Sequence, residues 1–409
     1  MAIFDKIYEL LKRKTASTHF IPAIDGLRFL AIWVVVMEHI HGFVRAKIPY
    51  AFVKPALDYP IFYGLFDRQG LKGVLLFFMI SGFILGMPFA KHYWQNDKPV
   101  KIKKYFIRRL TRLEPPYILN ILVSFFVILF YEGHGFAQSF FHSPISLGTN
   151  LISSLGYVHY VLFPNTFSVN PVTWSLELEV QFYILVPLLI LIFKLPKLYR
   201  RLLLVGVIVG LSALQEFYLR PVNAPVRPIS LIYYYLQYFL LGFLLLDIYL
   251  SGFRLKLKRG LNLPIGLVLV FLFFYFQTYN TSHFGLFFPI VIFALGVIAL
   301  TNETWTKIFS LRPITAIGGM CYSIYLWHNL AVSAVGNATI GINISRAYIP
   351  TMLWHFAIML PFVLLVSTFF YLLVEKPCMD PKWPQKLWQL AKKIYINEPK
   401  LSKESISNN

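Results

Sequence analysis

Charged residues are scarce in this chain of 409 residues. Asp, Glu, Lys and Arg together make up 14% of it, whereas 57% of the residues are hydrophobic. A soluble domain carries about a quarter charged residues, so the composition excludes an ordinary water-soluble fold. Cysteine is also rare, because only Cys321 and Cys378 are present and both lie in or beside apolar runs. A disulfide framework is therefore excluded, and we expect no metal site.

Acidic residues are fewer than basic residues. There are 18 Asp and Glu against 38 Lys and Arg, which gives a formal net charge of +20. In a soluble protein such an excess would suggest nucleic acid as a partner. Here the basic residues fall in short segments between apolar runs, where they set membrane orientation and contact anionic lipid. We therefore expect membrane lipid, and no nucleic acid, as a partner.

Several catalytic motifs are missing. The sequence has no G-x-S-x-G elbow, no phosphate-binding G-x-x-x-x-G-K-[ST] loop and no H-E-x-x-H pair. Serine-hydrolase, phosphate-loop and zinc-protease chemistry therefore lack support.

Apolar stretches of about 20 residues recur along the whole chain, which is typical of a polytopic membrane protein. We predict an all-α membrane helix bundle with ten transmembrane helices. The expected spans are 24–43, 71–90, 114–133, 174–194, 202–220, 230–250, 262–279, 284–301, 314–334 and 351–374.

The distribution of Lys and Arg predicts the orientation of the bundle. These residues gather in the N-terminal segment, the even-numbered loops and the C-terminal tail. The excess of positive charge on cytoplasmic segments then places both termini in the cytoplasm. We divide the chain into a cytoplasmic interfacial helix (1–20), a membrane domain (21–378), and a cytoplasmic amphipathic helix followed by a disordered tail (379–409).

The first expected span contains an arginine and a histidine at opposite ends. Arg28 precedes His39 by eleven residues, a helical rise of about 16 Å. Ionisable residues at membrane depth are costly and usually mark function. Arg28 is expected near the cytoplasmic face and His39 in the outer half. The pattern predicts an anionic group held on the inner side and acid–base chemistry further out.

Other polar residues are expected at the depth of His39. Glu177 and Glu179 open the fourth span, and His328 closes the motif Tyr322-Ser323-Ile324-Tyr325-Leu326-Trp327-His328 in the ninth. A histidine beside a carboxylate is a common general base with an orienting partner. Two alternatives remain open: these residues can simply join helices by hydrogen bonds, and Glu38 can be a charge at the outer interface.

The second cytoplasmic segment carries a dense group of cations. Arg109 and Arg112 are three residues apart and share a helix face, and Lys104 and Arg108 flank them. Paired guanidinium groups match phosphate oxygens. The alternative is that these cations only set topology and contact lipid headgroups. Ser81, followed by Gly82 in the second span, allows close approach of a ligand arm or of a neighbouring helix.

In this order, the motifs resemble the acyltransferase type 3 family of integral-membrane O-acyltransferases. The resemblance covers about residues 20 to 378. The matching segments are Asp25-Gly26-Leu27-Arg28 with His39, Phe77-Phe78-Met79-Ile80-Ser81-Gly82-Phe83, Arg109-Leu110-Thr111-Arg112 with Pro115-Pro116-Tyr117, Trp174-Ser175-Leu176-Glu177-Leu178-Glu179 with Gln181-Phe182-Tyr183, Tyr322 to His328, and Glu375-Lys376-Pro377.

The resemblance implies an activity and roles for individual residues. Members are mainly bacterial, and they move acetyl or related groups from cytoplasmic acyl-CoA to hydroxyls of cell-surface carbohydrates. It implies that His39 is the catalytic base, that Arg28 is essential, and that Arg109 and Arg112 engage the donor. It also implies a location in the bacterial cytoplasmic membrane.

From this we predict a mechanism. Acyl-CoA, which we expect to be acetyl-CoA, enters from the cytoplasm through a passage between the helices and meets a glycan or glycolipid hydroxyl from outside. His39 takes the proton of the hydroxyl, or briefly carries the acyl group itself, and Glu179 or Glu177 orients its ring. Tyr322, Ser323 or backbone N–H groups are candidate donors to the oxyanion. Trp174 and His328 are further candidates for substrate contact, although Trp174 also suits an interfacial anchor. The competing hypothesis is a proton-coupled transporter or flippase of a glycolipid or organic anion.

Overall fold

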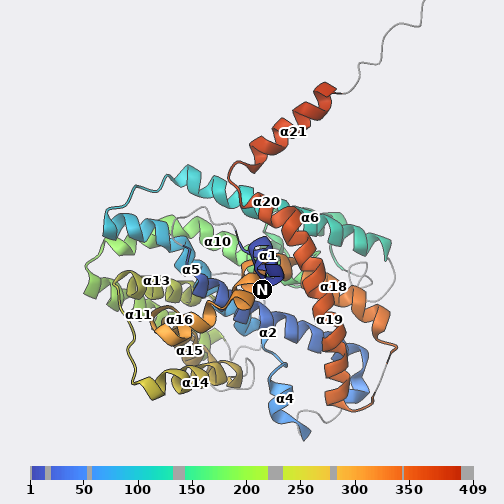
Figure 1. The fold of residues 1–409 in the computed structure, drawn as a ribbon, viewed down its shortest axis with the longest axis horizontal. Coiled ribbons are helices and arrows are strands. Elements are labelled where there is room, and N and C mark those ends of the chain that lie inside the picture. The colour runs from blue at the N-terminus through green and yellow to red at the C-terminus, as the bar shows by residue number, and fades with distance from the viewer. Residues whose placement is uncertain are drawn as a thin grey trace, which may run out of the picture.

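The computed structural model describes residues 2–13, 20–52, 58–131, 143–219, 234–276, 283–342 and 345–397. Within these ranges all regular secondary structure is helical and there is no strand (Figure 1). This confirms the predicted all-α class.

Seven helical stretches are long and apolar enough to cross a membrane. They are α2 (Pro22–Lys47), α5 (Gly70–Gln95), α6 (Ile102–Phe130), α10 (Trp174–Leu189) with the turns η2 (Pro171–Thr173) and η3 (Ile190–Lys194), α11 (Lys197–Leu214) with η4 (Gln215–Leu219), α15 (Phe284–Thr301), and α19 (Tyr348–Phe370) with η6 (Tyr371–Glu375) and α20 (Lys376–Cys378).

The other helices are shorter or less apolar. Two of them, α13 (Leu236–Leu250) and α14 (Asn262–Tyr275), are apolar but too short to count among the seven. The rest are α1 (Ala2–Leu11), η1 (Pro49–Phe52), α4 (Pro60–Gly64), α8 (Leu147–Leu155), α9 (His159–Leu162), η5 (Arg259–Leu261), α16 (Glu303–Phe309), α17 (Arg312–Gly319), α18 (Cys321–Thr339) and α21 (Trp383–Asn397). Each of the ten predicted spans overlaps at least one helix of the structure, long or short.

The ninth predicted span, 314–334, is broken in the structure. Its first part belongs to α17, and the apolar helix α18 starts only at Cys321. Gly318 lies at the contact between α17 and α2, because a Cβ there would lie 1.8 Å from the carbonyl oxygen of Asp25. The end of α17 is thus pressed onto the start of α2, and the chain turns before α18 begins.

The N-terminal helix α1 rests on the bundle. The hydroxyl of Tyr8 lies 3.5 Å from that of Thr315 in α17, and Lys376 donates to the carbonyl of Leu10 at 2.5 Å. By contrast, Figure 1 shows α21 pointing away from the other helices. Residues 400–409, which we expected to be disordered, lie outside the described ranges.

Glycine allows the central helices to approach closely. Gly73 of α5 packs on the carbonyl of Ala31 in α2, and Gly82 of α5 faces the carbonyl of Phe239 in α13. A Cβ at Gly82 would lie 2.0 Å from that oxygen. These contacts fix α2, α5 and α13 as the rigid centre of the bundle, on which the site described below is built.

Gly82→Ala is expected to destabilise the protein, because the added methyl group meets backbone that cannot move aside. Overpacking of this kind costs about 1–3 kcal/mol or more. The midpoint of thermal unfolding in detergent measures the effect. The matched control is Gly206→Ala in α11, where no atom lies within 4 Å of the added Cβ. An equal loss of stability in both variants would contradict the packing described here.

Candidate active site

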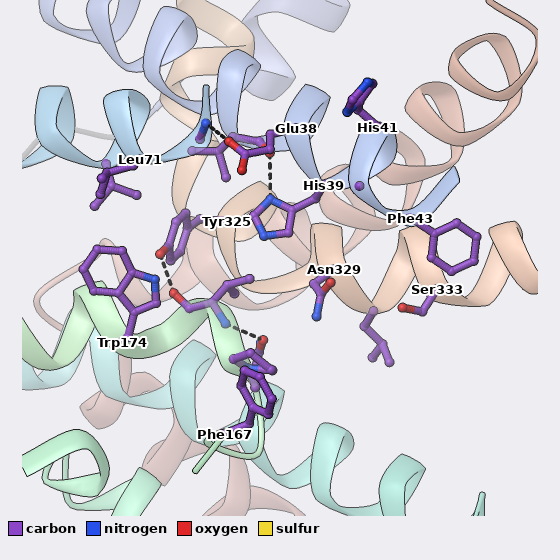
Figure 2. Close-up of a pocket in the computed structure, with 18 of the residues that line it drawn as sticks. Glu38, His39, His41, Phe43, Leu71, Phe167, Trp174, Tyr325, Asn329 and Ser333 are labelled. Atoms are coloured by element: carbon purple, nitrogen blue, oxygen red, sulfur yellow. Dashed lines mark hydrogen bonds between the residues drawn. The ribbon is translucent and has the colours of Figure 1, made fainter. Parts of the chain in front are cut away.

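A large cavity lies among the helices on the side where α2 ends. Its volume is about 1470 Å³, and α2, α5, α6, α10, α13, α15 and α18 all contribute to its wall. His39, Trp174, Tyr325 and Asn329 face this space together (Figure 2). We call it the outer cavity, after the predicted orientation.

His39 is held in one tautomer at the wall of the outer cavity. Its Nδ1 lies 2.8 Å from the carbonyl oxygen of Val35. A carbonyl only accepts hydrogen bonds, so Nδ1 carries a proton, and in the neutral imidazole Nε2 is then the nitrogen with the lone pair. The ring points from α2 toward Tyr325 and Asn329 (Figure 2). The arrangement leaves an imidazole nitrogen free to accept a proton from a bound molecule.

A second imidazole, that of His328, packs against the first. The two ring centroids are 4.7 Å apart and the rings are nearly perpendicular, at 82°. The Nδ1 of His328 lies 2.8 Å from the carbonyl of Tyr325, and its Nε2 has no hydrogen-bond partner among the described residues. Spans one and nine thus meet through their histidines. His328 is fully buried, so it contacts His39 rather than the open space of the cavity.

The two glutamates predicted to orient His39 are engaged elsewhere. Glu177 accepts hydrogen bonds from the backbone N–H groups of Tyr160 and Val161, both at 3.1 Å. Glu179 accepts one from the hydroxyl of Ser81 at 2.7 Å. Orientation of His39 therefore comes from the Val35 carbonyl. Glu177 anchors the segment before α10, and Glu179 and Ser81 join α10 to α5.

Glu38 is part of the cavity wall rather than an outer-interface charge. Its carboxylate accepts a hydrogen bond from the backbone N–H of Gly70, at the start of α5.

His41 also lines the cavity, and its Nε2 lies 3.0 Å from the hydroxyl of Tyr348. We did not single out His41 from the sequence, although its place two residues after His39 was a usable signal.

A smaller cavity of about 200 Å³ lies beside the cation-rich start of α6. Arg109, Glu179 and Tyr322 line it. The guanidinium of Arg109 lies between two aromatic rings, 5.8 Å from the centroids of both Tyr105 and Tyr183. Cation–π contacts of this kind hold the charge in place without neutralising it. We call this space the inner cavity.

A thin partition separates the two cavities, in place of the continuous passage that we expected. In α18, Tyr325 lines the outer cavity and Tyr322 the inner one. Before α10, Tyr160 lines the outer cavity and Tyr157 the inner one. Three residues of helix rise about 4.5 Å, so the partition is about one helical turn thick.

The segment before α10 packs into the bundle. We expected a long external loop over 133–173. Its described part, from Ser143 onward, forms α8 and α9, and the hydroxyl of Tyr117 in α6 donates to the carbonyl of Ser154 at 2.7 Å. The rings of Tyr117 and Tyr157 stack at 4.4 Å. The segment therefore forms part of the partition, while its residues up to 142 lie outside the described ranges.

The remaining predicted residues differ in their surroundings. Arg28 donates to Asp25 at 2.5 Å. The backbone N–H and the hydroxyl of Ser323 both donate to Glu375, at 3.0 and 2.5 Å. Ser323 therefore binds a carboxylate of the protein and not the substrate oxyanion that we predicted. The hydroxyl of Tyr322 donates to the carbonyl of Leu113 at 3.0 Å. Lys104 and Arg108 are exposed, Arg112 is half-buried, and Trp174 packs against Tyr235.

These observations define a membrane-embedded bundle with a histidine-lined outer cavity and an arginine-lined inner cavity. A family model described as an acyltransferase domain matches residues 21–372. The chain belongs to the acyltransferase type 3 family, as its motifs predicted, and together with its seven apolar helices this makes it an integral membrane protein.

Two named relatives are O-acetyltransferases. The peptidoglycan O-acetyltransferase OatA of Listeria monocytogenes is 28% identical over an alignment of 353 positions, gaps included, which covers 78% of this chain and 50% of the relative. The O-acetyltransferase OatA of Staphylococcus aureus is 25% identical over an alignment of 420 positions, gaps included, which covers 94% of this chain and 62% of the relative. The chain thus spans about half to three-fifths of the length of these relatives. No solved structure matches it.

Proposed function

We propose that this protein transfers an acyl group from cytoplasmic acyl-CoA to a hydroxyl of an extracytoplasmic glycan or glycolipid. One observation carries the proposal: His39 bonds the Val35 carbonyl through Nδ1 and lines a large cavity, and a partition one turn thick separates that cavity from the arginine-lined one. The acetyltransferase relatives make acetyl the first acyl group to test and a cell-wall polysaccharide the first acceptor.

The proposal gives each cavity one substrate. Arg109 and Arg112, with Lys104 and Arg108 nearby, attract the phosphates of acyl-CoA. The acyl end of the donor then reaches the partition beside Tyr322, Ser81 and Glu179. The acceptor occupies the outer cavity, where Trp174 and other aromatic side chains offer flat surfaces for sugar rings.

The chemical step follows from the tautomer of His39. Nε2 takes the proton from the acceptor hydroxyl while the oxygen attacks the thioester carbonyl carbon. The carbon–sulfur bond breaks, and the proton passes from the imidazole to the departing thiolate. The products are an O-acyl acceptor and CoA. Direct contact between the substrates requires the partition around Tyr322 and Tyr325 to open, since the two cavities share no lining residue.

The topology in this proposal has ten membrane-spanning helices and both termini in the cytoplasm of a bacterial inner membrane. The three helices beyond the seven long apolar ones are α13, α14 and α18. Supporting this count, each of the ten predicted spans overlaps a helix.

Transfer of an acetyl group from a labelled donor tests the proposed function. Purified protein in liposomes is given acetyl-CoA labelled in the acetyl group, together with peptidoglycan fragments or lipid-linked saccharide. Covalent label in the acceptor, and its mass increase by one acetyl group, are the expected results. Accumulation of unreacted acetyl-CoA or of acceptor inside the liposomes, without covalent transfer, would replace this proposal with a transporter or flippase.

A further inference from the structure

A buried cluster of charged side chains lies where α2, α6 and η6 meet the N-terminal segment. It consists of Arg13, Asp25, Arg28, Arg112 and Glu375, which we call the inner cluster. Asp25 joins two of the arginines, since its Oδ1 lies 3.3 Å from Arg13 and 2.5 Å from Arg28. Glu375 is held by Ser323, and Arg112 lies within electrostatic range of both Glu375 and Arg13.

The inner cluster has more positive than negative charge. Three guanidinium groups face two carboxylates, and both carboxylates are buried, with 2% exposure for Asp25 and 1% for Glu375. Adding Arg109 and Glu179 from the neighbouring inner cavity leaves the same excess. Burial, and then the nearby charges of Arg112 and Arg28, lower the pKa of Arg13 to about 9. An uncompensated buried cation is costly, so the cluster favours the arrival of an anion.

Several polar atoms of the cluster are buried without a partner. Among the described residues, no hydrogen bond reaches the Nε of Arg13, the Nε of Arg112, the Oδ2 of Asp25 or the hydroxyl of Tyr371. Tyr371 is fully buried and lies within electrostatic range of Arg13, Arg112 and Glu375. Buried polar atoms are nearly always hydrogen-bonded. Three of these four can donate, which fits a ligand that has several acceptor oxygens.

Arg13 is the member of the cluster that no sequence motif indicates. It lies before the part of the chain that the family model matches, which begins at residue 21. The structure nevertheless fixes it in place. Its side chain is only 11% exposed and bonds Asp25, and the preceding helix α1 is held by Lys376 through the Leu10 carbonyl and by an ion pair between Arg312 and Asp5.

We propose that Arg13 completes, with Arg28 and Arg112, a binding site for a phosphate group, and that this phosphate belongs to the acyl donor. The inference rests on the proposed function. Guanidinium groups from three separate segments gather in the inner cluster, and guanidinium groups match the several oxygens of a phosphate. The N-terminal segment is then a working part of the donor site rather than only a membrane-surface helix.

The test compares a donor that has phosphates with one that has none. KM is measured for acetyl-CoA and for acetyl-pantetheine, in nanodiscs of neutral lipid, for the wild type, Arg13→Gln and Lys12→Gln. Loss of a charged hydrogen-bond partner predicts a KM for acetyl-CoA about tenfold higher in Arg13→Gln, with the KM for acetyl-pantetheine unchanged within about twofold. Lys12 is the matched control, because its side chain is 41% exposed and its charge contacts Glu9 and the ring of Tyr8, which belong to its own segment.

Each other outcome overturns the inference. An equal rise in both KM values in Arg13→Gln assigns Arg13 a purely structural role, and no rise in either removes it from the site. A KM effect that appears only when anionic lipid is added to the nanodiscs assigns the site to a lipid headgroup phosphate. The proposed function fails separately, and only if the wild type transfers no acetyl group from either donor.

Discussion

His39→Gln is expected to lower kcat for acyl transfer by about a thousandfold, the middle of the range for loss of a general base. Glutamine is similar in size and can still donate to the Val35 carbonyl, but it has no nitrogen lone pair to take a proton. Release of CoA and acylation of the acceptor are measured together. The midpoint of thermal unfolding is expected to stay near that of the wild type, because the helix and its contacts are kept.

The matched control for this variant is His92→Gln at the inner end of α5. The Nδ1 of His92 bonds the carbonyl of Asp97 at 2.7 Å, so the control removes an imidazole with the same type of backbone bond. Its kcat is expected to stay within about twofold of the wild type. Near-normal transfer by His39→Gln would remove His39 from the chemistry.

Arg109→Ala combined with Arg112→Ala is expected to raise KM for acyl-CoA about a hundredfold, because each guanidinium offers charged hydrogen bonds worth about 1.5–3 kcal/mol. KM for the acceptor is expected to change little, since these residues lie on the other side of the partition from the outer cavity. Initial rates at varied concentrations of each substrate separate the two constants.

The control for the double variant removes two other cations from the same segment. Lys98→Ala with Lys101→Ala takes away equal charge at exposed positions that precede α6. If that control raises KM for the donor as much as the arginine pair does, general attraction to the membrane surface explains the effect. An unchanged donor KM in the arginine variant would give those residues only a topological role.

The sequence predicted that His39 and His328, on different helices, lie at the same level, because relative level follows from counting residues along each helix. Spans one and nine were expected to bring His39 and His328 to one level, and the rings are in contact. The helical class and the family were likewise predicted, since apolar runs and ordered motifs are visible without coordinates.

Rotation about each helix axis was not predicted, because depth does not determine it. Glu177 and Glu179 lie near one level, yet two residues turn a helix by about 200°. The two carboxylates therefore face opposite sides and bind different partners. For the same reason we predicted that the hydroxyl of Ser323 contacts the substrate. In the structure it donates to Glu375 instead.

Contacts between segments remote in the sequence were also beyond prediction. Arg13 precedes every motif, and only the packing of α1 on α17 brings it to Asp25. The segment from Ser143 to Thr173 was expected outside the bundle because its length and lack of Lys and Arg are typical of an external loop. In the structure this segment packs against α6, because Ser154 accepts a hydrogen bond from Tyr117 and Tyr157 stacks on the ring of Tyr117.

Transfer across the membrane is the central claim of this account, and the sidedness of the reaction tests it most directly. Protein in sealed liposomes of one orientation receives labelled acetyl-CoA, which cannot cross the bilayer, on one side and a soluble glycan acceptor on the other. We expect labelled acceptor only when acetyl-CoA is on the side of the two termini and the glycan is on the opposite side. Equal labelling with both substrates on the same side would contradict the account.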